Sequence, residues 1–131
     1  MIENNLGTIL QTIALVPMAD ITASADGTGI DVTEFVGLAA VTLSAKNVAG
    51  TNPTLIVKLQ DSANNTVFTD IAGAVFATVT AAGTKAATLE KITVNLAAAR
   101  TYIRAVQTIG GTASPQFLLS CTAVGVKQNR A

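Results

Sequence analysis

The fold class that the sequence predicts is all-β: an antiparallel β-sandwich, jelly-roll-like, with about eight or nine strands and at most one or two short helical turns. Three observations predict it. Apolar residues alternate with Thr, Ser, Lys and Asn in one segment after another, which is the period of a half-buried strand. Breaks rich in Gly, Asn and Pro separate these segments at intervals of roughly ten residues. The 131 residues form one domain, 1–131, long enough to bury a sizeable core.

The expected strands follow the alternation from one break to the next. In order they cover residues 8–16, 20–25, 37–48, 54–60, 67–71, 75–80, 89–96, 101–109 and 116–127. Pro17 is expected to end the first strand, because proline has no amide hydrogen to give to a ladder. Residues 31–35 and 96–102 are the two places where a single helical turn could lead into a strand.

Two of these segments show clearly which side chains should face the core. Leu55, Val57 and Leu59 point one way from the strand at 54–60, with Ile56, Lys58 and Gln60 on the other side. In the last strand, Phe117, Leu119, Cys121 and Ala123 share one face. The single cysteine is therefore expected to be a small buried core residue and not a reactive thiol.

The composition indicates a surface that is unusually poor in charge. Half of the residues are hydrophobic and only 12% are charged, against about 25% in ordinary soluble domains. Either uncharged polar side chains cover the surface, or part of it is hidden in an assembly. The net charge is zero, so we expect neither nucleic acid nor a membrane surface as a partner.

The charges that do occur are unevenly distributed along the chain. Acidic residues outnumber basic ones by four in residues 1–52, and basic residues outnumber acidic ones by four in residues 53–131. Either the fold mixes the two parts in space, or copies of the chain meet acidic surface to basic surface.

Catalytic chemistry has few residues to work with in this sequence. There is no histidine, and one cysteine allows neither an internal disulfide nor a thiolate metal site. The neighbouring carboxylates Asp26, Asp31 and Glu34 are expected to be turn and cap residues. A calcium site from Asp61, Asn64 and Asn65 is conceivable but does not follow a recognised loop spacing. We therefore expect no catalytic residue, no cofactor and no metal, and a protein that is not an enzyme.

The first residues resemble neither a membrane span nor a signal peptide. No segment approaches about 18 consecutive apolar residues, and the amino-terminal segment carries an acid and no basic region. Synthesis and folding are expected in a cytoplasm, which also suits a fold without disulfides.

The two ends of the chain are the expected assembly contacts. Residues 1–10 and 127–131 could act as arms that cross to a neighbouring subunit and extend its sheet. Arg100 and Arg104 flank Tyr102 and Ile103 and could pair with a carboxylate or reach a partner. The candidate interface residues are thus Ile2, Leu6, Ile9, Leu10, Arg100, Arg104, Lys127 and Arg130.

Two stretches resemble a known class of proteins. The first comprises residues 55–62, 64–65, 68–71 and 74–76, and the second comprises residues 100–106, 110–112 and 114–117. They resemble small structural proteins of tailed bacteriophages, including the head decoration or cement proteins, over roughly residues 25–128. Similar strand and turn patterns also occur in bacterial carbohydrate-binding and adhesive sandwiches.

The resemblance implies a jelly-roll sandwich on the outside of a phage head, in the virion. It would be a homodimer or homotrimer that binds the major capsid protein and stabilises the capsid lattice. The alternative function is a ligand-binding sandwich, for carbohydrate or a receptor, within a phage tail or fibre. The scarcity of aromatic residues argues against that alternative.

Overall fold

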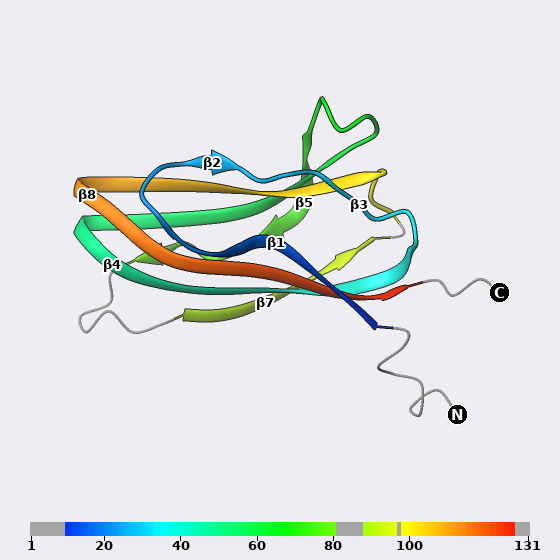
Figure 1. The fold of residues 1–131 in the computed structure, drawn as a ribbon, viewed down its shortest axis with the longest axis horizontal. Coiled ribbons are helices and arrows are strands. Elements are labelled where there is room, and N and C mark those ends of the chain that lie inside the picture. Colours follow the sequence, from blue (N-terminus) through cyan, green and yellow to red (C-terminus); the bar gives the residue numbers. More distant parts are fainter. Residues whose placement is uncertain (1–9, 81–87, 97, 128–131) are drawn as a thin grey trace.

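The computed structural model describes residues 10–80, 88–96 and 98–127, and all of its strand pairings are antiparallel (Figure 1). No helix occurs among these residues. The strands are β1 (Leu10–Ile21), β2 (Ala25–Asp26), β3 (Ile30–Asp31), β4 (Phe35–Ser62), β5 (Thr69–Val75), β6 (Val79–Thr80), β7 (Thr88–Asn95) and β8 (Tyr102–Lys127). The turn expected at 31–35 is a simple turn, closed by a bond from the Phe35 amide to the Val32 carbonyl, and the described residues of 96–102 form no helix.

Two long strands, β4 and β8, organise the molecule. They pair with each other along nearly their whole length and fold over together at a shared corner, which Figure 1 shows at the left. Residues 35–49 pair with 116–127 on one side of the corner, and residues 54–62 pair with 102–110 on the other. The corner therefore turns one continuous ribbon into two packed layers.

Each layer has four strand positions once β4 and β8 are divided at the corner. In layer 1 the order is β1, the second half of β8, the first half of β4, and β7. In layer 2 the order is β2 with β3, the first half of β8, the second half of β4, and β5 with β6. This is the strand arrangement of a jelly roll. The expected all-β, jelly-roll-like sandwich is thus confirmed.

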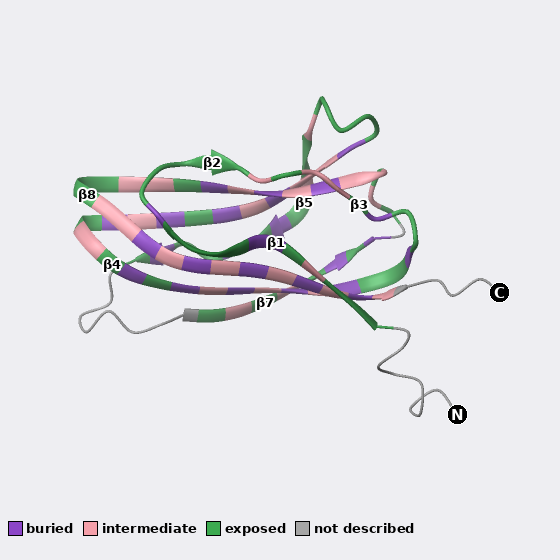
Figure 2. Cartoon of the chain, viewed as in Figure 1, coloured by how far each residue is buried: buried purple, intermediate pink, exposed green. Residues whose placement is uncertain are grey.

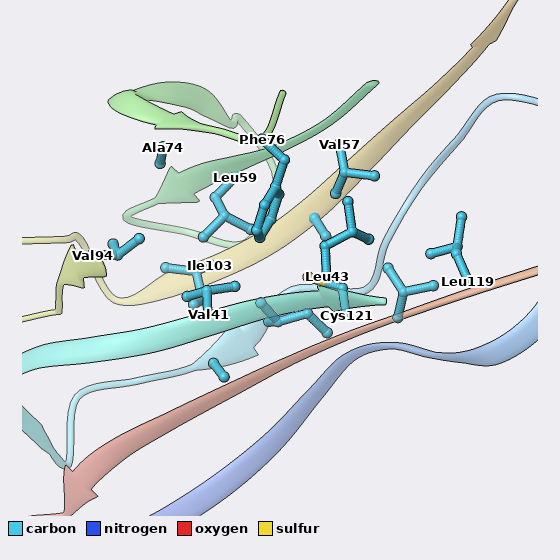
Figure 3. Packing of buried hydrophobic residues seen from close by; sticks show 14 of the residues in the cluster. Val41, Leu43, Val57, Leu59, Ala74, Phe76, Val94, Ile103, Leu119 and Cys121 are labelled. Atoms are coloured by element: carbon cyan, nitrogen blue, oxygen red, sulfur yellow. The ribbon is translucent and has the colours of Figure 1, made fainter. Parts of the chain in front are cut away.

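The core lies between the layers and follows the alternation read from the sequence (Figure 2). Leu55, Val57 and Leu59 of layer 2 are fully buried, and so are Phe117 and Cys121 of layer 1. Figure 3 shows Val57 and Leu59 with Leu43 and Cys121 in this cluster. The side chains come from both layers, as sheet-on-sheet packing requires.

Glycines at the corner allow the ribbon to fold over. Gly50 in β4 and Gly111 in β8 have φ values of 111° and 116°, which residues with a Cβ rarely adopt. A Cβ on Gly50 would lie 2.6 Å from Pro115 Cα. The backbones of β4 and β8 approach so closely at this corner that no side chain would fit at Gly50.

The structure corrects three of the expected strand boundaries. The first strand does not end at Pro17: β1 continues to Ile21, because register shifts on either side of Val16 let the edge strand accommodate the proline. The segments expected at 37–48 and 54–60 are one strand, as are those at 101–109 and 116–127. The intervening glycines mark a bend within a paired ribbon and not a loop between strands.

Candidate assembly face

The outer surface of layer 1 is the most distinctive surface of the described residues. Every described strand belongs to one of the two layers, so none is left to cover it. On each strand of layer 1 the outward side chains alternate with the buried ones, and the strand register brings outward side chains of neighbouring strands side by side. We call this surface the Thr/Val face and define it as Leu10, Thr12, Ala14, Asp20, Val36, Leu38, Ala40, Thr42, Ser44, Lys46, Leu89, Lys91, Thr93, Asn95, Leu118, Ser120, Thr122, Val124 and Val126.

The Thr/Val face carries few charged side chains for the solvent side of an antiparallel sheet, and most of its polar residues are Thr and Ser. Its only charged residues are Asp20, Lys46 and Lys91. Leu38 and Leu89 are 64% and 75% exposed. Both faces of layer 1 are therefore rich in apolar side chains, but only one of them packs in the core.

The apolar residues concentrate at the end of layer 1 that lies away from the corner. Register places Leu10, Val126 and Val36 in one row across three strands, and Val124 lies beside Ala40 in the next row. β1 begins and β8 ends in the same place. The first described residue, Leu10, and the last of β8, Lys127, therefore both lie at this apolar end.

The outer surface of layer 2 is of the opposite kind, because charged and amide side chains bind one another across it. Lys58 Nζ lies 3.1 Å from Asp70 Oδ2, and Gln60 Nε2 donates to Asp70 Oδ1 at 2.8 Å. These bonds lower the pKa of the Asp70 carboxyl, with the Gln60 bond contributing most. Ile56 and Val75 are exposed beside these groups, so the surface is mixed, but the charged and amide side chains named above are already paired with one another.

Arg104 belongs to this polar surface and is used within the chain. Its Nε donates to Gln60 Oε1 at 2.9 Å, and its Nη2 lies 3.5 Å from Asp26 Oδ2. The guanidinium carbon lies 4.0 Å from the centroid of the Phe68 ring. Because Asp26 comes from the acidic part of the sequence and Arg104 from the basic part, the fold mixes these two charges in space.

Arg100 is held by Asp61 in a multidentate contact. Its Nε and Nη2 donate to Asp61 Oδ1 at 3.0 and 2.8 Å, and its backbone amide donates to Asp61 Oδ2 at 3.1 Å. Burial would raise the pKa of the Asp61 carboxyl, but the bonds from Arg100 outweigh it and the pKa is lowered. This contact joins the end of β4 to the turn before β8. Of the two roles expected for Arg100, pairing with a carboxylate or reaching a partner, the pairing with a carboxylate is observed.

The other expected interface residues divide into two groups. Leu10 lies on the Thr/Val face, and Lys127 ends β8 opposite Phe35. Ile2, Leu6, Ile9 and Arg130 lie outside the described residues. The structure thus brings Leu10 and Lys127 to one end of layer 1 but places Arg100 and Arg104 in contacts with layer 2, and their role at an interface stays a prediction.

Two further residue groups have structural partners. Asn64 Oδ1 accepts bonds from Ser62 Oγ and from the Thr66 and Val67 amides at 3.0 Å each, so this amide closes the loop between β4 and β5. Cys121 is fully buried, and burial raises the pKa of its thiol to about 12. The cysteine is a core residue, as expected.

The sequence led us to expect contacts through an apolar, Thr-rich surface but did not show which strands form it. The signal was present in residues 37–48, where Leu38, Ala40, Thr42 and Ser44 form a second uncharged side opposite the core side. Only the pairing of this strand with β7 and β8 shows that these side chains continue across four strands.

No protein-family model matches the sequence, and no curated protein matches it either. Among solved structures, the fold is similar to that of a chain from Bacillus endospore appendages, described as disulfide-linked pili, with a TM-score of 0.50 and 19% identity over 92% of this chain and 90% of that one. It is also similar to VP2 of infectious bursal disease virus in a subviral particle, with a TM-score of 0.49 and 12% identity over 90% of this chain and 32% of that one. A chain from the Gx strain of the same virus gives a TM-score of 0.47 and 11% identity, again over 90% of this chain and 32% of that one.

The pilus similarity extends over nearly the full length of both chains and supports the fold described above. This chain spans about a third of the length of the two viral chains. No helix able to span a bilayer occurs among the described residues.

Proposed function

We propose that this chain is a structural virion protein: a capsid decoration, or cement, protein that binds the outer surface of a phage head and stabilises the lattice of the major capsid protein. The Thr/Val face is the observation that carries the proposal. Exposing the leucines of this face to water is unfavourable, and only three charged residues lie on it, so a partner that covers the face is expected. The protein acts by packing and is not an enzyme.

The positions of the aromatic residues support a packing role over the ligand-binding alternative. Sugar rings are often bound by stacking on exposed aromatic side chains. All five aromatic residues lie within the described part of the chain: Phe35, Phe76 and Phe117 are buried, and Phe68 lies under the Arg104 guanidinium. Tyr102 is half-buried, so no exposed ring is left to stack on a sugar.

The single buried cysteine supports assembly without covalent links. The similar Bacillus chain comes from pili described as disulfide-linked. In this chain Cys121 is fully buried and its thiolate is suppressed, so it cannot reach a second copy while the strand is paired. Association is therefore expected to be noncovalent.

The test looks for a major capsid gene beside the gene for this chain, as the proposal expects, and then measures binding to heads built from that capsid protein. Purified chain is mixed with heads that lack it, and the heads are sedimented and then heated. We expect saturable co-sedimentation and a higher temperature of head disruption, because a ligand that binds only the assembled lattice stabilises it by mass action. Absence of binding at saturating concentration, with a folded chain, would refute the proposed function.

A second arm of this test addresses the ends of the chain. Removing residues 1–9, or residues 128–131, is expected to weaken binding to heads while the thermal unfolding of the sandwich changes little. A matched control carries Gly/Ser residues of the same number in place of the removed ones. Full binding by both shortened chains would show that the ends are not contacts.

A further inference from the structure

We propose that the edge of the sandwich formed by β1 and by β2 with β3 binds an extended segment of another polypeptide, which carries a lysine or arginine and, two residues away, an amide side chain. The site lies apart from the Thr/Val face, so the inference goes beyond the proposed function and does not depend on it. It rests on two adjoining cavities and on a buried glutamine that points into one of them.

The backbone of β1 is open to a further strand. β1 ends layer 1, and β2 with β3 ends layer 2 on the same side of the sandwich (Figure 1). Among the described residues, each of these strands pairs only with β8. Half of the backbone amides and carbonyls of β1 therefore face away from its partner, and an extended peptide is the ligand that can bond to such a row. Pro17 has no amide hydrogen, so the added pairing is expected to end before it.

Two cavities follow each other along β1, between this strand and residues 25–35. The first has a volume of about 460 Å³ and extends from Gln11 to Ala14, and the second, of about 290 Å³, extends from Ala14 to Pro17. They adjoin at Ala14 and Ile30, which line both. Every second side chain of an extended segment projects to the same side. We therefore expect one side chain in each cavity, from residues of the partner that are two positions apart.

The first cavity carries negative charge. The exposed residues Asp31 and Glu34 line it, and no lysine or arginine is among the described residues that line either cavity. Asp31 Oδ1 accepts bonds from the amide and the hydroxyl of Thr33 at 2.9 and 2.7 Å, which hold this carboxylate in place. A lysine or arginine side chain is the complement of this cavity.

The second cavity is apolar except for a buried amide. Gln107 lines it and belongs to the inward side of β8, together with Ile103 and Ala105. This residue is only 9% exposed, and within the described part of the chain its side-chain amide has no hydrogen-bond partner. Leu15 and Val16 supply apolar lining. An unpaired buried amide is unfavourable, and a second amide can both donate to it and accept from it. Asparagine or glutamine is therefore the side chain expected in this cavity.

The opposite edge of the sandwich fits such a segment less well. A cavity of about 410 Å³ lies there, between β5 and β7. The only carboxylate among its described lining residues, that of Asp61, is already bound by Arg100 at 2.8 Å. Glu90 Oε1 accepts a bond from the Ala77 amide at 3.0 Å and so links the two layers at this edge. The charge and the unpaired amide together favour the edge at β1.

The test uses a fluorescein-labelled peptide of sequence Thr-Lys-Val-Gln-Val-Lys-Thr, which reads the same in both directions and so fits a parallel or an antiparallel strand. Fluorescence anisotropy is measured with the full chain at up to about 1 mM, and we expect saturable binding within this range. A peptide with glutamate in place of both lysines is expected to bind at least about 10-fold more weakly. A peptide with leucine in place of glutamine is expected to bind about 5-fold more weakly.

Variants of the chain assign each preference to its cavity. Gln107→Leu should abolish the preference for glutamine over leucine in the peptide and keep the preference for lysine over glutamate. Asp31→Asn combined with Glu34→Gln should do the reverse. Asp20→Asn is the matched control and should change neither preference, because Asp20 is an exposed carboxylate of β1 on the Thr/Val face. Should Gln107→Leu fail to fold by circular dichroism, Gln107→Met replaces it.

The outcomes separate this site from the capsid-binding role. Absence of saturable binding up to about 1 mM, equal binding of the lysine and glutamate peptides, or a glutamine preference that survives the change at Gln107 would overturn the inference. Thr122→Lys, on the Thr/Val face, is expected to weaken binding to heads and to leave peptide binding unchanged. A chain that binds the peptide but not heads would refute the proposed function alone, and a chain that binds heads but not the peptide would refute this inference alone.

Discussion

Replacing Gly50 by alanine should show how strongly the corner constrains the sandwich. The added Cβ would lie 2.6 Å from Pro115 Cα and 3.0 Å from Pro115 Cβ. The first of these atoms is backbone and moves only if β8 moves. Gly50 also has a φ of 111°, a conformation that costs a residue with a Cβ about 1–3 kcal/mol. Overpacking adds about 1–3 kcal/mol, so we expect a loss of about 2–6 kcal/mol.

This loss is large compared with the total stability of about 5–15 kcal/mol that is usual for a domain. In urea, with an m-value of about 2 kcal/mol per molar, the unfolding midpoint should fall by about 1–3 M. Gly73→Ala is the matched control, because Gly73 also has a positive φ, of 77°, but a Cβ there would meet nothing within 4 Å. It should lose only the backbone contribution of about 1–2 kcal/mol. Equal losses in the two variants would show that close packing at the corner does not limit the fold.

Three other predictions test the core and the ion pair. Arg100→Ala should lower the free energy of unfolding by about 1–2 kcal/mol at pH 7, measured in urea. The pKa of Asp61 is lowered in the folded chain, so the stability lost in Arg100→Ala should be fully present above pH 3.8, the ordinary pKa of an aspartate. The loss should become smaller as the pH falls below that value. An unchanged loss at pH 2–3, measured on folded protein, would contradict the assignment. Phe117→Ala should cost about 3–5 kcal/mol, and a loss below 1 kcal/mol would show that this ring is not central to the core. Cys121 should resist a thiol reagent in the native state and react at the rate of unfolding, whereas rapid labelling of folded protein would contradict its burial.

Local patterning determined the class of the fold and much of its core. Successive side chains in a strand point to opposite faces of the sheet, so the face depends only on whether a position is odd or even. This alternation was enough to identify the buried residues of two strands, Leu55, Val57 and Leu59 in one and Phe117, Leu119 and Cys121 in the other. The absence of histidine and the single cysteine likewise restrict the available chemistry, whatever the arrangement of the strands.

Long-range pairing decided the rest. The glycines at 50 and 111 indicate a break in the sequence, but only the pairing of β4 with β8 shows that the ribbon bends there without ending. Arg100 and Asp61 are 39 residues apart, so their contact could not be deduced from neighbouring residues. In residues 37–48 both sides are uncharged over most of their length, and parity alone cannot say which side faces the core. Packing against layer 2 selects Val41 and Leu43 for the core and leaves Leu38 and Thr42 on the Thr/Val face.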